Sequence, residues 1–467
     1  MALLAALREA LGPQAVLVDP VEREAFECDW RGLVKNPALA VVLPESPGQV
    51  VEVVELCARH KVKIVPQGGN TGLVAGAVPV AGVEQIILSF SRLRAVREID
   101  VVNDSITVEA GLTLAALQQE AARVGRFFPV SLGAEGTAEI GGVISTNAGG
   151  LQVLSYGSMR AQVLGLEVVL HDGRIWHGLS GLRKDNTGYD LKQIFIGAEG
   201  TLGLITAATL RLYPPIAARA SALIGIETLK HGLDIFISLR QAAGTGLTLC
   251  EFCTHEALAL GAAHSPAGRL PFLAPAYLLV EVSALAGGAD PQETMETSLS
   301  SALEAGKALD VVIAKSERER LAFIALREAI SEGERREGGA VKHDIAVKLG
   351  DLPRMVEDVQ ALVARKYPGF RLNIFGHVGD GNLHVNVRPP AGRNMVDITT
   401  LQKADITADI EALAVSLQGS FSAEHGIGQL RLHGMEAHKP ATDLALMQTI
   451  KQALDPHKLF NPGKTIP

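Results

Sequence analysis

The chain has 467 residues, which is too long for one ordinary hydrophobic core and predicts two or three domains. Hydrophobic residues make up 47% and charged residues 20%, the balance of an ordinary soluble globular protein. The formal net charge of −8 argues against a nucleic-acid-binding protein, because such a protein needs a basic face. The sequence has no apolar run of about 18 residues or more, so no membrane span is predicted.

The predicted elements begin with a short amphipathic helix that ends at Gly12. This segment lacks the basic leader and the small-residue cleavage site of a signal peptide, which favours a cytoplasmic location. The next helix has a visible start, with Ser46 as N-cap, Pro47 in the first turn and Gln49 completing a capping box. Strands are expected on both sides of it, at 38–43 and 61–66, which predicts a β-α-β opening.

Further strands are predicted at 85–90 and 104–111, followed by a helix at 113–125. A hairpin is expected around Asp172-Gly173. The prolines of Leu210–Pro215 close this first segment. Beyond them strands and helices alternate, which predicts an α+β layer with helices on one face of a largely antiparallel sheet. Near the C-terminus, Leu446, Ile450 and Leu454 have helical spacing before Pro456.

Four cysteines in this length do not make a disulfide scaffold. Cys250 and Cys253 have the CxxC spacing of half a zinc or redox site, but they lie in the strand-like stretch "GLTLCEFCTH". The preferred interpretation is a buried strand, and a metal or redox role is the alternative.

Three glycine-rich segments occur within the first 206 residues: "VPQGGNTGLVAGAVP", "SLGAEGTAEIGGVISTNAGG" and "GAEGTLGLIT". None matches the GxGxxG fingerprint, because the glycines are misplaced and no amphipathic helix follows the first segment. Each could be a plain glycine turn. Together they favour one long ligand that lies against exposed backbone N–H groups. The tail "NPGKT" is not a P-loop, since Lys458 stands where the leading glycine should be.

The stretch "NIFGHVGDGNLHVNV" places His377 and His384 on either side of a glycine-rich turn, so the two rings can face one another from adjacent strands. With Glu424 of "SAEHGIGQ" they would form a set of three ligands that leaves positions open on a zinc ion. Two histidines satisfied within a hairpin and a surface glutamate are the alternative.

Six motifs together resemble the FAD-linked D-2-hydroxy-acid dehydrogenases of the vanillyl-alcohol-oxidase type, most closely those that oxidise D-2-hydroxyglutarate. They are "PQGGNTG", "IGGVISTNAGG", "KDNTGYDLKQIFIGAEGTLGLIT", "FGHVGDGNLHVNV", "SAEHGIG" and "DPHKLFNPGK". They occur in the family's order along nearly the whole chain, and several are long.

The resemblance implies an α+β fold with three parts: an FAD-binding domain at 1–215, built of two α+β subdomains, a substrate or cap domain with a mainly antiparallel sheet at 216–415, and a helical C-terminal segment at 416–467 that packs back on the FAD domain. Asn70 follows Gly68-Gly69 where relatives with covalent flavin often carry histidine, so FAD is expected to be non-covalent. The implied cofactor-binding residues are Pro66, Gly68, Gly69, Asn70, Thr71, Gly72, Gly133, Gly136, Thr137, Gly141, Gly142, Asn147, Gly150, Ile205 and Asn461.

The resemblance also implies a divalent cation, Zn²⁺ or a similar ion, at His377, His384 and Glu424. Such an ion lowers the pKa of a bound hydroxyl, and His425 is then the candidate general base for the hydroxyl proton. Adjacent residues on an extended chain point in opposite directions, so "EHG" needs a turn, which Gly426 makes possible. A role for His425 in supporting the ligands only is the alternative.

The substrate is expected to be set by Arg327, Ser331 and Lys342, which match the spacing at which D-2-hydroxyglutarate dehydrogenases hold the distal carboxylate. Arg327 and Ser331 share one helical face, and arginine can bind a carboxylate by two parallel hydrogen bonds. A plain exposed charged helix is the alternative, and it is the expectation for 332–337. Asn386 shares the strand face of His384 and is expected to orient the substrate.

Several alternatives remain open at this stage. The acid could be D-lactate, D-malate or a broad range of D-2-hydroxy acids. The chain could be a flavin-binding subunit without turnover, or a flavin-dependent transferase of the same fold, which would need a long apolar channel. Relatives pass electrons to an electron-transfer flavoprotein or to quinone, and the sequence does not decide between these acceptors or between a monomer and a homodimer.

Overall fold

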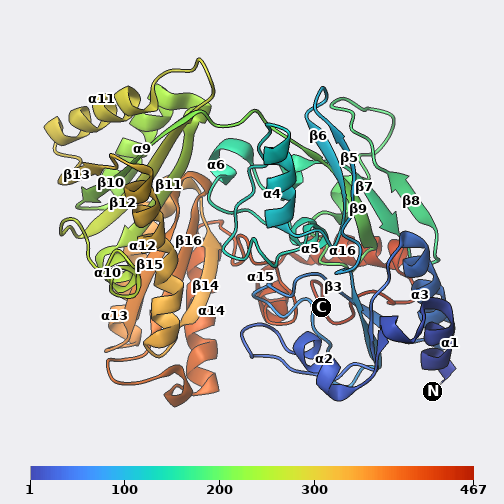
Figure 1. Ribbon diagram of the computed structural model, residues 1–467. Helices are drawn as coiled ribbons and strands as arrows, with labels where there is room; N and C mark the ends of the chain where they lie inside the picture. Colours follow the sequence, from blue (N-terminus) through green and yellow to red (C-terminus); the bar gives the residue numbers. More distant parts are fainter. Residues whose placement is uncertain (1) are drawn as a thin grey trace. The chain divides into compact units, whose positions relative to one another are not determined.

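The computed structural model describes residues 2–467, which divide into two compact units (Figure 1). Unit 1 contains the chain up to Gly150 together with Tyr156–Pro215 and Glu424–Pro467. Unit 2 contains Leu151–Ser155 and Ile216–Ala423. The chain therefore leaves unit 1 at the predicted prolines and returns to it at Glu424, later than residue 416.

Unit 1 holds two sheets. The smaller has the strand order β1-β2-β4-β3, in which β2 and β3 each pair with β4 in parallel and β1 pairs with β2 antiparallel. The predicted strands on either side of the first long helix are thus not neighbours, because β4 lies between them. The larger sheet has the antiparallel order β5-β6-β9-β7-β8. The strands are β1 (Val16–Leu17), β2 (Val41–Val42), β3 (Lys63–Gln67), β4 (Gln85–Ser89), β5 (Val96–Asp100), β6 (Ser105–Glu109), β7 (Val163–Val169), β8 (Ile175–Gly178) and β9 (Leu204–Arg211).

The helices of unit 1 cover these sheets, and two large apolar cores lie between helices and sheets. The first helix and the third pack on the smaller sheet, and the fourth and fifth pack on the larger one. The helices are α1 (Ala2–Leu11), α2 (Pro20–Glu27), α3 (Pro47–His60), α4 (Leu114–Arg123), α5 (Ile140–Ser145), α7 (Met159–Gln162), α8 (Lys192–Phe195), α15 (Leu432–His438) and α16 (Ala441–Leu454), and α6 (Val153–Tyr156) lies where the chain passes between the units.

Local signals in unit 1 act largely as the sequence predicts. The Ser46 hydroxyl accepts the Gln49 backbone N–H at 3.2 Å and caps α3. The reciprocal bond of the expected capping box is displaced by one residue, because the Gln49 side chain accepts the N–H of Glu45. The hairpin at Asp172-Gly173 joins β7 and β8.

Unit 2 is built on one antiparallel sheet of seven strands in the order β13-β10-β12-β11-β15-β16-β14. The strands are β10 (Ala218–Ile226), β11 (Leu247–Thr254), β12 (Ala276–Ala284), β13 (Asp310–Ile313), β14 (Val341–Ala346), β15 (Arg371–His377) and β16 (Asn382–Arg388). The helices are α9 (Leu229–Ala243), α10 (His255–His264), α11 (Pro291–Glu304), α12 (Glu317–Arg336), α13 (Leu352–Lys366) and α14 (Thr400–Ser416).

Helices cover both faces of this sheet, not one face as the alternation alone indicated. One face buries its apolar side chains against α9, α11, α13 and α14. The opposite face carries a smaller core against α10 and α12. The two cysteines of "CEFC" show the division, since Cys250 belongs to the first core and Cys253 to the second. They point to opposite faces and cannot share a metal ion, which confirms the buried strand.

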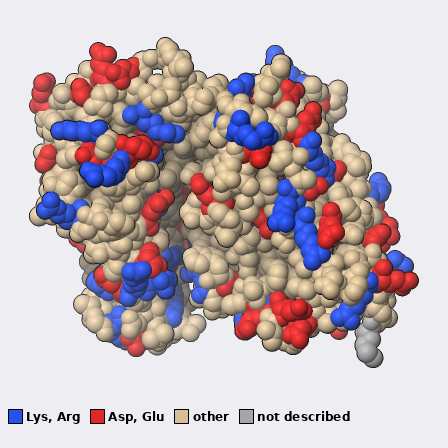
Figure 2. Space-filling model, viewed as in Figure 1, with Lys and Arg blue, Asp and Glu red and all other residues tan. Residues whose placement is uncertain are grey.

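Neither sign of charge dominates the surface in Figure 2. On the face drawn in Figure 2, lysine and arginine side chains are interspersed with aspartate and glutamate. Among residues 2–467, no helix has both the length and the apolar character needed to cross a membrane.

Candidate active site

The glycine-rich segments of unit 1 lie together. The loop after β3 packs on the second segment so closely that a Cβ at Gly69 would lie 1.8 Å from the Thr137 carbonyl oxygen. The third segment joins them, because the Gly197 N–H donates to the Ile144 carbonyl and a Cβ at Gly200 would lie 2.4 Å from the Pro66 ring. The structure therefore assembles segments that are far apart in the sequence into one layer of loops, called here the glycine cradle.

The C-terminal tail closes the glycine cradle through Asn461. Its backbone N–H donates to the Ile64 carbonyl, and its side-chain amide donates to the carbonyls of Glu199 at 2.7 Å and Gly76 at 3.1 Å. Asn461 thus ties the tail to the first and third glycine-rich segments.

Apart from Gly68, the predicted cofactor-binding glycines fall into two groups. A Cβ at Gly69, Gly141 or Gly150 would collide with the backbone or side chain of a neighbouring loop. A Cβ at the members of the second group would meet no atom within 4 Å, so their backbone faces open space that a ligand can occupy. This second group is Gly72, Gly133, Gly136 and Gly142. The open backbone fits a long ligand such as FAD.

The predicted asparagines brace the loops with their side chains. Asn70, Asn147 and Asn461 all have φ near +50°, a conformation that asparagine tolerates better than most residues. The Asn70 amide donates to the Cys28 carbonyl, and the Asn147 side-chain oxygen accepts from the Ser158 hydroxyl and the Arg160 N–H. Ile205 lies in the core of the larger sheet, so only its backbone can reach a ligand.

A buried carboxyl lies beneath the glycine cradle at Glu139. Its side chain is 7% exposed, its Oε2 has no hydrogen-bond partner, and it lies 3.5 Å from the position of a Cβ at Gly68. Burial raises the pKa of Glu139 to about 8. The carboxyl is therefore protonated through most of the neutral range.

In unit 2, strand register gathers the predicted polar residues on the sheet face that α10 and α12 cover. Phe375 and Asp344 both pair with His384, and Glu251 pairs with His377. Residues two positions apart on a strand share a face, so Lys342 and Asn386, which pair with each other, lie on it too. We call this row of residues the polar face.

His377 and His384 are brought together as predicted. Their ring centroids are 5.8 Å apart and their planes are nearly perpendicular, and their ligand atoms lie within 4.8 Å of one another. The Nδ1 of His377 contacts the Glu251 carboxylate, and the Nδ1 of His384 lies 3.7 Å from Asp344 Oδ1. An imidazole whose Nδ1–H faces a carboxylate keeps a lone pair on Nε2, which suits a metal ligand.

Glu251 is a site residue that sequence reasoning missed. It is 1% exposed and also accepts the Nε–H of Arg327 at 2.6 Å, while the Arg327 guanidinium lies 5.1 Å from the centre of the Phe375 ring. Burial acts to raise the pKa of Glu251, but the charges of Arg327 and His377 outweigh it and hold that pKa well below its usual range. The sequence signal for Glu251 was the presence of one acidic residue within the apolar strand that contains "CEFC".

Glu334 corrects the expectation that 332–337 is an exposed helical stretch. Its side chain is 0% exposed, and its carboxylate accepts from the amides of Asn373 and Asn386 at 3.0 Å and pairs with Lys342 at 2.9 Å. The preceding Gly333 lets α12 approach α10, since a Cβ there would lie 2.9 Å from Leu260. Ser331, by contrast, is exposed.

Glu424 and His425 belong to unit 1. The residues that follow them are hydrogen-bonded to the first glycine-rich segment. Gly426 has φ +78°, which supplies the expected turn. The Gln429 amide donates to the carbonyls of Ala75 and Val78, both at 2.9 Å. Glu424 also directly follows Ala423 of unit 2, whose N–H donates to the Asp344 carbonyl at 3.1 Å.

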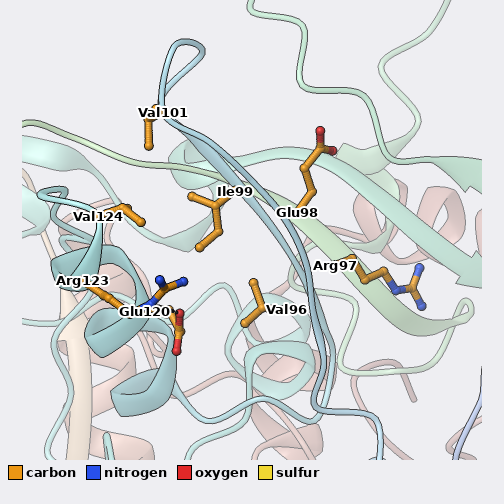
Figure 3. Close-up of a pocket in the computed structure, with 8 residues that line it drawn as sticks. All are labelled: Val96, Arg97, Glu98, Ile99, Val101, Glu120, Arg123 and Val124. Atoms are coloured by element: carbon orange, nitrogen blue, oxygen red, sulfur yellow. Dashed lines mark hydrogen bonds and ion pairs between the residues drawn. The ribbon is translucent and has the colours of Figure 1, made fainter.

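A surface hollow of about 410 Å³ lies elsewhere in unit 1, between β5 and α4 (Figure 3). Val96 and Ile99 point toward α4, whereas Arg97 and Glu98 point away from it. The hollow contains none of the predicted site residues, and its lining mixes apolar side chains with charged ones.

Comparison with known proteins identifies an FAD-binding domain and a C-terminal oxidase domain. Residues 38–178 match the family model "FAD binding domain", and residues 216–465 match "FAD linked oxidases, C-terminal domain". The mitochondrial D-2-hydroxyglutarate dehydrogenase of Bos taurus is 37% identical over 99% of this chain and 83% of its own length. The D-2-hydroxyglutarate dehydrogenase of Xanthomonas citri pv. viticola is 36% identical over 98% of this chain and 95% of its own.

The chain belongs to the D-2-hydroxyglutarate dehydrogenase family. The FAD-linked oxidoreductase predicted from the motifs is thereby confirmed.

Solved structures support the predicted fold. An alkyldihydroxyacetonephosphate synthase matches 99% of this chain and 84% of its own with a TM-score of 0.75 and 16% identity. p-Cresol methylhydroxylase with bound substrate matches 99% and 96% with a TM-score of 0.75 and 17% identity. At these identities the likeness shows the fold alone. It confirms the predicted vanillyl-alcohol-oxidase type of fold for this member of the D-2-hydroxyglutarate dehydrogenase family.

The two groups of cradle glycines predict two different defects. Gly69→Ala should lower the free energy of unfolding of the FAD-free protein by about 2 kcal/mol or more, because the new Cβ would collide with the backbone of Thr137. Gly133→Ala should leave that stability unchanged and weaken FAD affinity. Calorimetry of the FAD-free protein and titration with FAD measure the two effects. Equal stability loss in both variants would contradict the division.

Glu139 predicts a dependence of stability on pH. Its folded pKa is raised from 4.5 to about 8, so the folded state holds a proton that the unfolded chain has lost between these values. Stability should therefore fall as pH rises through this window, by an amount on the order of 2–4 kcal/mol. Glu139→Gln should reduce this fall, and Glu120→Gln on α4 should not. Thermal midpoints at about pH 5 and about pH 8 measure it.

Proposed function

We propose that this chain oxidises D-2-hydroxyglutarate to 2-oxoglutarate and passes the electrons to FAD bound in the glycine cradle. The observation that carries the proposal lies in unit 2, where Arg327 and Lys342 are each held by a buried carboxylate at the sheet face that also carries His377 and His384. The substrate is a diacid with a hydroxyl and a carboxylate at one end and a second carboxylate at the other. Imidazoles can hold a metal ion that binds the hydroxyl and carboxylate of the first end, and cationic side chains can bind the carboxylate of the second.

The distal carboxylate is assigned to Arg327 and Lys342. Arg327 is fixed by its bond to Glu251 and by the Phe375 ring, so little side-chain entropy is lost when it binds an anion. Lys342 has three N–H donors, and one is directed to Glu334 at 2.9 Å. Ser331 lies one helical turn from Arg327 and can add a hydroxyl. D-Lactate has no distal carboxylate and would not use this set.

A divalent cation is assigned to His377, His384 and Glu424. The facing imidazoles and their acidic partners support two of these ligands. Glu424 is one peptide bond from Ala423, which is hydrogen-bonded to the strand partner of His384. When bound there, such an ion would lower the pKa of the substrate hydroxyl.

We assign the proton and hydride transfers as follows. His425 accepts the hydroxyl proton as general base. Asn386 orients the substrate, because both its amide bonds go to Glu334 and its side-chain oxygen has a fixed direction. FAD bound in the glycine cradle would supply the acceptor for the hydride of the substrate Cα. The electron acceptor, either an electron-transfer flavoprotein or quinone, stays a prediction. The non-covalent state of FAD, a homodimer and a cytoplasmic location also stay predictions.

The substrate assignment predicts which acids reduce the flavin. Under anaerobic conditions D-2-hydroxyglutarate should bleach the flavin absorbance promptly, D-malate and D-lactate should act much more slowly, and the L-isomers should not act. A chelator should abolish the bleaching, and added Zn²⁺ should restore it. Equal bleaching by D-lactate would overturn the diacid assignment, and bleaching that withstands the chelator would overturn the metal's role.

Lys342→Gln tests the distal carboxylate separately. The amide can still donate to Glu334, but the charge is lost, so KM for D-2-hydroxyglutarate should rise about 10- to 100-fold. The KM for D-lactate should stay within about twofold. Arg320→Gln on α12 is the matched control, since Arg320, like Lys342, pairs with a buried carboxylate, that of Glu281. The assignment fails if the lysine variant changes KM for both acids alike. Steady-state kinetics supply these values.

A further inference from the structure

A buried carboxylate in unit 1 holds the turn that follows His425. The Glu199 side chain accepts the backbone N–H groups of Ile427 and Gly428, both at 2.8 Å. Two successive N–H groups directed at one carboxylate form a nest that fixes the backbone conformation. The third glycine-rich segment therefore contacts "EHGIG" through a carboxyl side chain, not only through its glycines.

The conformation of this turn depends on the space that Glu199 occupies. A Cβ at Gly426 would lie 2.8 Å from Glu199 Oε1, so glycine is needed there for steric reasons as well as for its φ of +78°. A Cβ at Gly428 would lie 2.1 Å from the Val74 carbonyl oxygen. The segment after His425 thus lies between the Glu199 carboxylate and the first glycine-rich segment.

Glu199 is itself held firmly. It is 8% exposed and adopts φ +49°, its N–H donates to the Ser145 carbonyl at 2.8 Å, and its carbonyl accepts from Asn461. Lys464, which is 2% exposed, donates to the Asn461 side-chain oxygen at 2.6 Å. Burial raises the pKa of Glu199 and lowers that of Lys464 to about 7, and the opposite charge of each residue offsets only part of this cost.

We propose that Glu199 is a positioning residue that sets the direction of His425 by fixing the backbone of Gly426–Gly428. The proposal rests on the proposed function, in which His425 is the general base. Glu199 touches neither substrate nor the reacting atoms and acts through the turn. Its loss should therefore affect the rate of the proton-transfer step and leave substrate affinity unchanged.

Glu199→Gln in the FAD-loaded enzyme tests this. The amide keeps one acceptor oxygen but turns an NH₂ group toward the second N–H, so one bond is lost. The rate of anaerobic flavin reduction should fall about tenfold or more, with KM within about twofold and FAD content unchanged. The amides of Ile427 and Gly428 should exchange with deuterium about tenfold faster. Glu27→Gln is the matched control, because Glu27 is also buried in unit 1 and accepts a backbone N–H, that of Ala38 at 2.8 Å.

Unchanged exchange at Ile427 and Gly428, an equal rate loss in the Glu27 variant, or loss of FAD from the Glu199 variant would each overturn the proposal. If the variant does not fold, hydrogen exchange in the wild-type protein still tests the bonds to Glu199. The Ile427 and Gly428 amides must exchange far more slowly than those of the surface turn at Gly287-Gly288, and equal rates would overturn the proposal. If wild-type flavin is reduced by no D-2-hydroxy acid, the proposed function fails, and the exchange measurement still tests the bonds to Glu199.

Discussion

The antiparallel register of β11, β15, β16 and β14 is the constraint on which the unit 2 part of the site depends. It sets Glu251 opposite His377 and sets both Phe375 and Asp344 opposite His384. The residues between them, such as Ile374 and Val385, point into the core on the other face. A slip of one residue would exchange the two sets and bury the imidazoles among apolar side chains. Core packing therefore fixes which side chains lie on the polar face.

Buried carboxylates then orient the basic and polar side chains beside them. Glu251 contacts both His377 and Arg327, and Glu334 contacts both Lys342 and Asn386. A carboxylate inside a protein is stable only when it is paired and hydrogen-bonded. The same requirement therefore keeps the imidazole, the guanidinium and the ammonium in place. Glu199 has the corresponding position in unit 1, where its partners are backbone N–H groups.

The glycine cradle follows a different principle. Its strongest constraints come from contacts between loops, as at Gly69 and Gly150, where any side chain would meet a carbonyl oxygen. These contacts leave the open glycines, including Gly133, with backbone directed at free space. The cradle is thus defined by loop packing first, and a ligand can use the surface that this packing leaves.

The sequence by itself determined most of the elements and the residue types of the site. Helix starts such as Ser46, the turn at Asp172-Gly173 and the hairpin between His377 and His384 are local events, and neighbouring residues suffice to specify them. Tertiary structure alone decided that β4 separates β2 from β3, that helices cover both sheet faces, and that Glu334 is buried. Tertiary structure also determined which side chain pairs with each buried acid. Glu251 and Arg327 are 76 residues apart, and no local pattern reports a pairing that exists only after distant strands and helices have packed.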